Sequence, residues 1–149
     1  MSLKFLTPKN SLELFTPDDS DALEIVLAET GISAGFPSPA DDFKEYKISL
    51  DKTLVRNKEA TFYARVSGQS MIGAGLDDGD LLVVDRSLEP THNKIAVCFI
   101  DGEFTVKRLK VTSEGVYLQP ENPAYQPILI TDTNDFQIWG IVTHVIKRV

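Results

Sequence analysis

Residues 95–109 read Ile-Ala-Val-Cys-Phe-Ile-Asp-Gly-Glu-Phe-Thr-Val-Lys-Arg-Leu. Two apolar runs, 95–100 and 104–109, flank the dipeptide Asp101-Gly102. An Asp-Gly pair between such runs is typical of a β-hairpin, because these residues tolerate the positive φ angles of a tight turn. The stretch therefore predicts two antiparallel strands joined by a two-residue turn.

The same pattern recurs on both sides of this hairpin. Further strand-like runs occupy residues 61–66, 81–85, 116–119, 128–130 and 136–146, and turn dipeptides such as Asp78-Gly79 and Glu114-Gly115 separate them. Short strands closed by tight turns, with no long helices between them, indicate a mostly β fold. We expect antiparallel strands and hairpins in one compact β domain.

The first third of the chain has a different character. Thr16-Pro17-Asp18-Asp19 offers an N-cap, a proline at the first helical position and an acidic first turn. This pattern predicts a helix from about residue 17 to 29, ended by Gly31, which either packs as an ordinary element or covers a functional site. Brief helical turns are expected at 39–46 and 49–55. The small residues and two prolines of 31–39 predict an extended, accessible segment.

Composition narrows the function classes. The chain has 149 residues, 42% of them apolar, and its 15 basic and 22 acidic side chains give a net charge of −7. This balance disfavours direct DNA or RNA binding, which depends on basic side chains. The single cysteine, Cys98, excludes an intrachain disulfide. We find neither a signal peptide nor a membrane-spanning run, so we expect a cytoplasmic protein.

Two separated motifs carry candidate chemistry. Ser67-Gly68-Gln69-Ser70-Met71 places a hydroxyl in a glycine-bearing turn after a predicted strand, and Lys107 follows Phe104 and Val106 in an alternating run. We expect Lys107 to share their core-facing side, where burial favours the neutral amine that can deprotonate a serine. Glycines in the turn (68, 73 and 75) leave the amides of Gln69 and Ser70 free to face a developing oxyanion. This constellation indicates acyl transfer by a serine-lysine pair.

Three ordered blocks then resemble the LexA/UmuD family of self-cleaving peptidases, and its UmuD branch in particular. They are Ser67 to Met71, Asp77-Asp78-Gly79-Asp80-Leu81-Leu82-Val83-Val84-Asp85, and Asp101 to Leu109. The similarity continues through Gln119-Pro120-Glu121-Asn122-Pro123-Ala124-Tyr125 to the C-terminal run 139–146, and covers about residues 35–149. Ala34 and Gln69 depart from the usual UmuD pattern, which carries a cysteine and an acidic residue there.

The resemblance implies a LexA/UmuD C-terminal-domain-like fold with Ser70 as nucleophile and Lys107 as general base. It implies a cut between Ala34 and Gly35, which divides the chain into an N-terminal regulatory arm, 1–34, and a β domain, 35–149. It further implies a homodimer, cleavage stimulated by RecA filaments in the SOS response, and a fragment that serves a UmuC-like translesion polymerase. It implies no cofactor. An arm of this length is too short for a helix-turn-helix domain, which argues against a repressor.

Other readings remain open. The same fold could be a non-catalytic interaction module that binds a polymerase or RecA, or a signal-peptidase-like enzyme acting on other proteins. His92 and His144 are composition-level candidates for a catalytic triad, but we expect both to be structural. Cys98 lies in an apolar run and is expected to be unreactive. The aspartates at 77, 78, 80 and 85 lack calcium-loop spacing and are interpreted as turn residues, so no metal site is expected.

Overall fold

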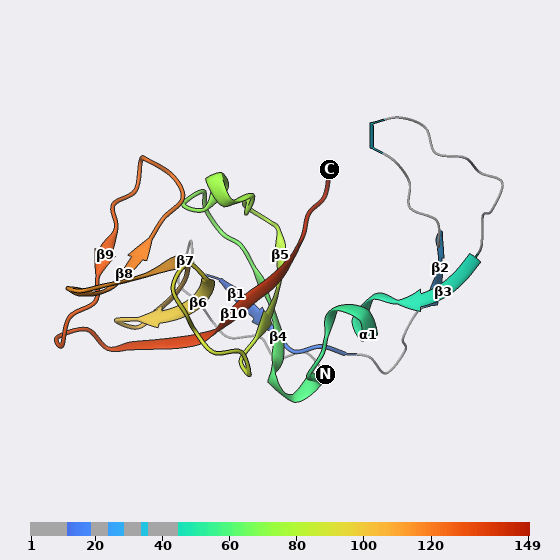
Figure 1. Ribbon diagram of the computed structural model, residues 1–149, viewed down its shortest axis with the longest axis horizontal. Coiled ribbons are helices and arrows are strands. Elements are labelled where there is room, and N and C mark those ends of the chain that lie inside the picture. Colours follow the sequence, from blue (N-terminus) through green and yellow to red (C-terminus); the bar gives the residue numbers. More distant parts are fainter. Residues whose placement is uncertain (1–11, 19–23, 29–33, 36–44) are drawn as a thin grey trace. The chain divides into compact units, whose positions relative to one another are not determined.

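The computed structural model describes residues 12–18, 24–28, 34–35 and 45–149 (Figure 1). The chain forms two compact units. The larger unit contains residues 12–17 and Asn57–Val149, and the smaller unit contains the described parts of Asp18–Arg56.

The described strands of the larger unit form one antiparallel sheet of eight strands (Figure 1). Their spatial order is β1 (Glu13–Phe15), β4 (Thr61–Arg65), β5 (Leu81–Asp85), β10 (Phe136–Ile146), β6 (Ile95–Ile100), β7 (Glu103–Thr112), β8 (Gly115–Gln119) and β9 (Ile128–Leu129). Two short 3₁₀ helices, η1 (Lys58–Ala60) and η2 (Ile72–Ala74), accompany them. The prediction of a mostly β fold with antiparallel hairpins is confirmed, and the predicted strands agree with the observed bounds to within a few residues.

The turn between β6 and β7 has the predicted conformation. Asp101 and Gly102 both have positive φ angles, 49° and 89°, as a two-residue hairpin with the right-handed strand twist requires. The Asp101 carboxylate accepts hydrogen bonds from the side chain of Asn134 and the amide of Asp135. The hairpin is thereby tied to the segment that leads into β10, and this fixes the position of β7 within the sheet.

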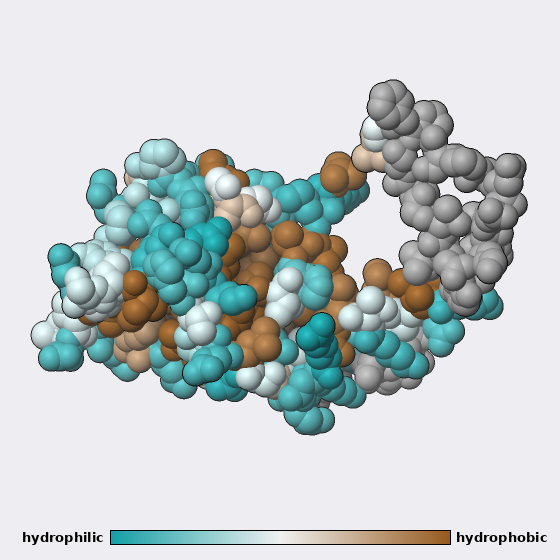
Figure 2. Space-filling view, in the orientation of Figure 1, coloured by the Kyte–Doolittle hydropathy of each residue, from teal (hydrophilic) through white to brown (hydrophobic). Residues whose placement is uncertain are grey.

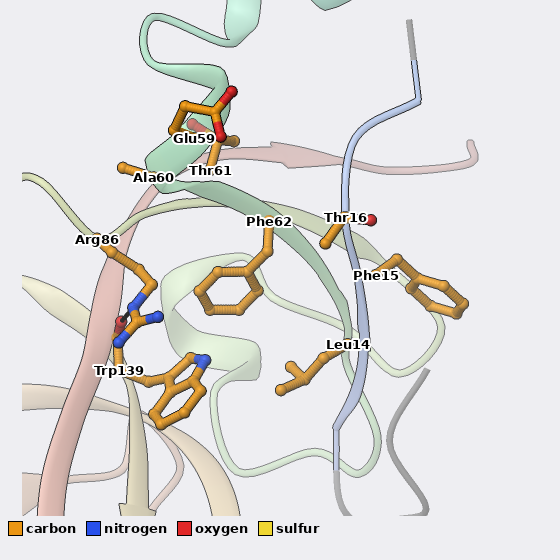
Figure 3. Close-up of a pocket in the computed structure, with 9 residues that line it drawn as sticks. All are labelled: Leu14, Phe15, Thr16, Glu59, Ala60, Thr61, Phe62, Arg86 and Trp139. Carbon is orange, nitrogen blue, oxygen red and sulfur yellow. Dashed lines mark hydrogen bonds between the residues drawn. The ribbon is translucent and has the colours of Figure 1, made fainter. Parts of the chain in front are cut away.

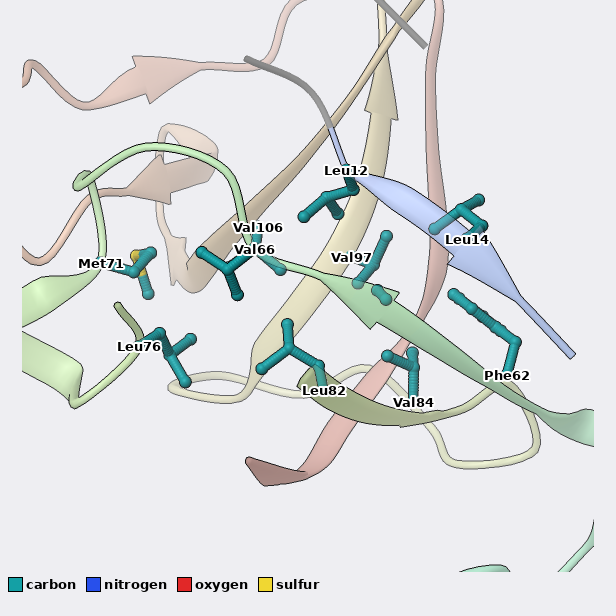
Figure 4. Packing of buried hydrophobic residues seen from close by; sticks show 11 residues of the cluster. Leu12, Leu14, Phe62, Val66, Met71, Leu76, Leu82, Val84, Val97 and Val106 are labelled. Carbon is teal, nitrogen blue, oxygen red and sulfur yellow. The ribbon is translucent and has the colours of Figure 1, made fainter. Parts of the chain in front are cut away.

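Both faces of the central strands are covered. One cluster of buried residues includes Val97 of β6 and Val106 of β7, and Figure 4 shows its side chains pointing toward one another between β1, β4, β5 and the central strands. The second cluster includes Cys98 of β6 and Leu109 of β7. Successive side chains of a strand point to opposite faces, so the continuous apolar runs of β6 and β7 supply both clusters.

The short strand β1 is an integral part of the larger unit. It pairs antiparallel with β4, with Leu14 opposite Ala64. Leu12 and Leu14 are only 3% and 2% exposed and join the first cluster (Figure 4). β1 also borders an apolar pocket of about 130 Å³, in which the Arg86 guanidinium lies 4.4 Å from the Trp139 ring (Figure 3). Hydrophobic side chains are also visible on the surface over β4 and β5 (Figure 2).

The smaller unit differs from the sequence-based expectation. β2 (Glu24–Ala28) pairs antiparallel with β3 (Glu45–Ser49), and α1 (Leu50–Leu54) follows. The helix predicted over 17–29 is therefore wrong in its described C-terminal half, and 19–23 and 29 lie outside the described residues. The helical turn predicted over 39–46 is wrong at its end, where Glu45 and Tyr46 belong to β3, while 39–44 lie outside the described residues. The turn predicted over 49–55 is confirmed as α1.

Pairing explains the first of these corrections. Residues 24–28 read Glu-Ile-Val-Leu-Ala, and β-branched residues such as Ile25 and Val26 suit a strand when a partner is available. The partner, β3, lies far along the chain, so the local N-cap signal at residue 16 favoured the wrong structure. In the part of the chain that the structure describes, no helix is long and apolar enough to cross a membrane.

Candidate active site

The turn that carries Ser70 follows directly from β4. Gly68 has a φ of 87°, and its amide donates a 2.7 Å hydrogen bond to Oδ1 of Asp78. A positive φ favours glycine at this point, because other side chains are strained there. Met71, 2% exposed, anchors the far side of the turn in the core. Ser70 therefore lies at the surface of the core on a segment held at both ends.

Lys107 reaches this turn from β7. Its Nζ lies 3.0 Å from Oγ of Ser70, although 37 positions separate the two residues. The same nitrogen lies 2.8 Å from Oγ1 of Thr105 and 3.0 Å from the carbonyl oxygen of Val106. These are hydrogen-bond distances, so the amine is held on three sides.

Lys107 is buried, but the face on which it lies corrects the sequence argument. Phe104 and Val106 belong to the first cluster, whereas strand alternation places Lys107 on the opposite face, with Thr105 and Leu109. The expectation that Lys107 shares the face of Phe104 and Val106 is wrong. The lysine is nevertheless only 8% exposed, because both faces of β7 are covered.

Burial has an electrostatic consequence. The low-dielectric surroundings disfavour the ammonium form, so burial lowers the pKa of Lys107, against a smaller opposing effect from Cys98. A neutral lysine has two N–H donors and one lone pair. The two donors fit Thr105 Oγ1 and the Val106 carbonyl, which leaves the lone pair to accept the hydroxyl proton of Ser70. The arrangement suits general-base chemistry.

The backbone around Ser70 also offers donors. Within the part of the chain that the structure describes, the amides of Gln69 and Ser70 donate no hydrogen bond to the protein. Preorganised amides of this kind stabilise a developing oxyanion. They border an open cleft of about 440 Å³, lined by Ser67, Gly68, Gln69, Ser70, Thr105, Lys107 and Tyr125.

A second, much smaller pocket lies beside the nucleophile. Its volume is about 30 Å³, and its lining includes Ser70, Met71, Phe104 and, from the segment before β1, Leu12. A pocket of this size accepts a small side chain and excludes a large one. Apolar side chains and the hydroxyl-bearing residues Ser67, Ser70 and Thr105 share its lining.

Ala34 and Gly35 belong to the smaller unit. Both are exposed and lie at a bend in the connection between β2 and β3. Open space surrounds the position at which a side chain on Gly35 would project. The bond between Ala34 and Gly35 is therefore exposed in the smaller unit.

The other sequence candidates have different surroundings. His92 Nδ1 accepts a 2.9 Å hydrogen bond from the Val111 amide, and His144 is exposed beside Thr143. Cys98 is fully buried, and this burial raises the pKa of its thiol to about 12. All three lie outside the residues that line the cleft.

The four aspartates considered as possible metal ligands are held by contacts with other residues of the protein. Asp77 and Asp80 form ion pairs with Lys147, Asp78 accepts from the Gly68 amide, and Asp85 accepts from Ser87. Among the described residues, no group of histidine, cysteine and acidic side chains has the arrangement of a metal site.

Several residues at the site were missed by the sequence analysis. Thr105 could have been found, because it lies two positions before Lys107 and therefore on the same face of a predicted strand. Tyr125 in the cleft wall ends one of the stretches that resemble the family, and Leu12 in the small pocket comes from a segment without a local signal. Their role depends on distant packing.

Comparison with known proteins agrees with this geometry. A family model described as "Peptidase S24-like" matches residues 26–143. Protein ImpA of Escherichia coli is 42% identical over 140 residues, which are 89% of this chain and 90% of that protein. Protein MucA of Salmonella typhimurium is 46% identical over 114 residues, 76% of this chain and 77% of that protein. The LexA repressor of Syntrophotalea carbinolica is 37% identical over 140 residues, 94% of this chain and 67% of the repressor.

Proposed function

Because this chain belongs to the peptidase S24-like family, we propose that it is a UmuD-like autopeptidase that cuts its own Ala34–Gly35 bond. Ser70 is the nucleophile and Lys107 the general base. The observation that carries the proposal is the 3.0 Å separation of Lys107 Nζ from Ser70 Oγ, together with the burial of the amine. Proton transfer requires a distance of about 2.6–3.2 Å.

Acylation is the first half of the reaction. Neutral Lys107 accepts the hydroxyl proton as Oγ of Ser70 attacks the carbonyl carbon of Ala34. The negative charge that develops on the carbonyl oxygen is stabilised by the amides of Gln69 and Ser70. Lys107 then returns the proton to the nitrogen of Gly35, the peptide bond breaks, and Ala34 remains bound to Ser70 as an ester.

Deacylation reverses these roles with water as the nucleophile. Lys107 accepts a proton from the water as it attacks the ester carbon, and the same proton returns to Oγ of Ser70 when the ester breaks. The products are residues 1–34, ending in a carboxylate, and residues 35–149. The small pocket beside Ser70 supports this choice of bond, because it suits the methyl group of Ala34 and rejects larger side chains.

The family and the named relatives support a biological setting. We propose that the protein acts in the cytoplasm, and that its cleavage is stimulated by RecA filaments on single-stranded DNA during the SOS response. The fragment 35–149 then acts as a homodimeric subunit of a UmuC-like, error-prone translesion polymerase. The activity turns over once, on the chain itself, and the lasting role is that of the processed subunit.

The test follows the mass of the full-length protein as pH rises from neutral to about 10, near the ordinary range of lysine titration. Cleavage after Ala34 is expected to accelerate as Lys107 loses its proton. Ser70→Ala and Lys107→Ala are expected to stay intact. Ser113→Ala, in an exposed turn, and Lys110→Ala, on the same strand as Lys107, are controls expected to cleave normally.

The alternative is a non-catalytic interaction module of the same fold. An intact mass at every pH, with RecA filaments also supplied, would favour this module over the peptidase. Cleavage of an added peptide in trans with many turnovers would instead indicate an enzyme that acts on other proteins.

A further inference from the structure

We propose that Glu121 is a positioning residue: the segment 119–123 ties the Ser70 turn to β7 and so sets the separation of Ser70 and Lys107. This inference rests on the proposed function, since it concerns the same pair. Segment 119–123 bonds both to the turn that carries Ser70 and to β7, which carries Lys107.

One side of the segment holds the turn. The Glu121 amide donates a 2.8 Å hydrogen bond to the carbonyl oxygen of Ser70, and the Gly73 amide donates a 2.8 Å bond to the carbonyl oxygen of Glu121. Asn122 Nδ2 donates a 2.9 Å bond to the carbonyl oxygen of Gln69. The three bonds are made to residues before, at and after the nucleophile, so they fix the backbone on which Ser70 lies.

The approach of the two segments is close. A side chain at position 73 would place its Cβ 2.6 Å from the carbonyl oxygen of Glu121, a backbone atom that cannot move aside cheaply. Asn122 is itself held, because its Oδ1 accepts a hydrogen bond from the Ala124 amide. The contact is therefore built from rigid groups.

The other side of the segment holds β7. Nε of Arg108 lies 2.5 Å from Oε1 of Glu121, and the two side chains are 27% and 30% exposed. Nη1 of Arg108 also donates a 2.7 Å bond to the carbonyl oxygen of Asn93. Arg108 follows Lys107 directly in the chain and faces Gln119 across the β7–β8 ladder. Glu121 thus connects the backbone of the nucleophile to the neighbour of the base.

This connection matters more for rate than for stability. A partly exposed ion pair contributes little to folding. A misplacement of about 1 Å between reacting groups, in contrast, costs roughly 10²-fold in rate. Loss of the ion pair is therefore expected to slow self-cleavage while leaving the fold nearly unchanged.

The test compares self-cleavage by full-length Glu121→Gln with the unchanged chain across the alkaline range. Its plateau rate is expected to fall by about 10-fold, within the range that a sub-ångström displacement produces, at an unchanged melting temperature. The charge-swapped chain, Glu121→Arg with Arg108→Glu, is expected to recover rate relative to either single change. Glu114→Gln is the matched control, because Glu114 is also hydrogen-bonded, to Tyr117, but lies at the far end of the β7–β8 hairpin.

A second readout does not depend on cleavage. In the Ser70→Ala background, hydrogen exchange of the Gly73 and Glu121 amides is expected to be slow and to accelerate in Glu121→Gln. Wild-type cleavage rates and unchanged exchange in Glu121→Gln would overturn the inference, as would a lower rate fully explained by a lower melting temperature. If the unchanged chain never cleaves, the proposed function fails. Hydrogen exchange alone then decides whether segment 119–123 holds the Ser70 turn in place.

Discussion

Thr105 Oγ1 lies 2.8 Å from Nζ of Lys107, and the two residues occupy the same face of β7. A lysine side chain has many rotamers, and a free amine would spend much of its time away from Ser70. The threonine, with the Val106 carbonyl, restricts Nζ to the position from which its lone pair faces the hydroxyl.

Thr105→Val is therefore expected to slow self-cleavage without unfolding the protein. Valine has nearly the same shape but lacks the hydrogen-bonding oxygen. The expected loss is between about 10-fold and the roughly 10²-fold that a 1 Å misplacement costs. Mass spectrometry of cleavage over time measures it. Thr112→Val serves as the control, because Thr112 lies on the same strand but bonds the carbonyl of Gly115 in a distant turn; equal slowing of both variants would contradict the assigned role.

The pH dependence of cleavage follows from the lowered pKa of Lys107. Burial favours the neutral amine, so the rate is expected to rise with pH with a midpoint below 10.5, the ordinary pKa of lysine. A rate profile at constant temperature measures the midpoint. A midpoint at or above 10.5 would mean that Lys107 is not the titrating base in the buried position described here.

The same shift affects stability. The folded state releases its Lys107 proton at a lower pH than the unfolded state does, so between the two pKa values the unfolded state binds more protons. The free energy of unfolding therefore rises with pH across this window, which ends near 10.5. Relative to Lys107→Met, which lacks this titration, the unchanged lysine chain should gain stability as pH rises. Urea denaturation in the Ser70→Ala background checks this, and a difference independent of pH would contradict it.

The parts of the fold that local sequence specifies were predicted well. Asp101 and Gly102 supply the φ angles of their turn by themselves, and the flanking runs need no distant information to be identified as strands. Lys107 shows the limit of the pattern. Its burial was predicted, but strand alternation places it on the face opposite Phe104 and Val106. It is buried there because both clusters pack around β7.

Elements that depend on distant partners could not be predicted. The N-cap signal at Thr16 predicted a helix, whereas pairing with β3 makes residues 24–28 a strand. The three-residue strand β1 is too short to show the alternation of apolar and polar residues that marks a strand, so the burial of Leu14 could not be predicted. Likewise, nothing local indicates that Glu121 bonds the backbone of Ser70. Only their tertiary contacts reveal these roles.

Leu14→Ala is expected to destabilise the larger unit. Leu14 is 2% exposed and packs in the first cluster, and removing such a side chain typically costs about 2–5 kcal/mol. Val111→Ala, at a 52% exposed position of β7, is the control and should cost much less. Urea denaturation of both variants in the Ser70→Ala background measures the difference. Similar small losses would show that β1 contributes little to the stability of the unit.

The ion pair of Asp80 with Lys147 affects how stability changes in acid. Its burial alone would raise the pKa of this carboxyl, but the hydrogen bonds from Lys147 and from the Asp77 amide, with the charge of Lys147, lower it below 3.8 overall. Folding thus favours the ionised carboxylate of Asp80. Its stabilising contribution to the free energy of unfolding is fully present above the pKa of the unfolded state, and it is lost as pH falls through the lower pKa of the folded state. Asp80→Asn should therefore flatten the loss of stability below about pH 4, whereas Glu89→Gln, at an exposed position, should not. Denaturation curves between neutral and acid pH measure both slopes, and parallel curves for the unchanged chain and Asp80→Asn would show that the Lys147 pair does not couple to folding.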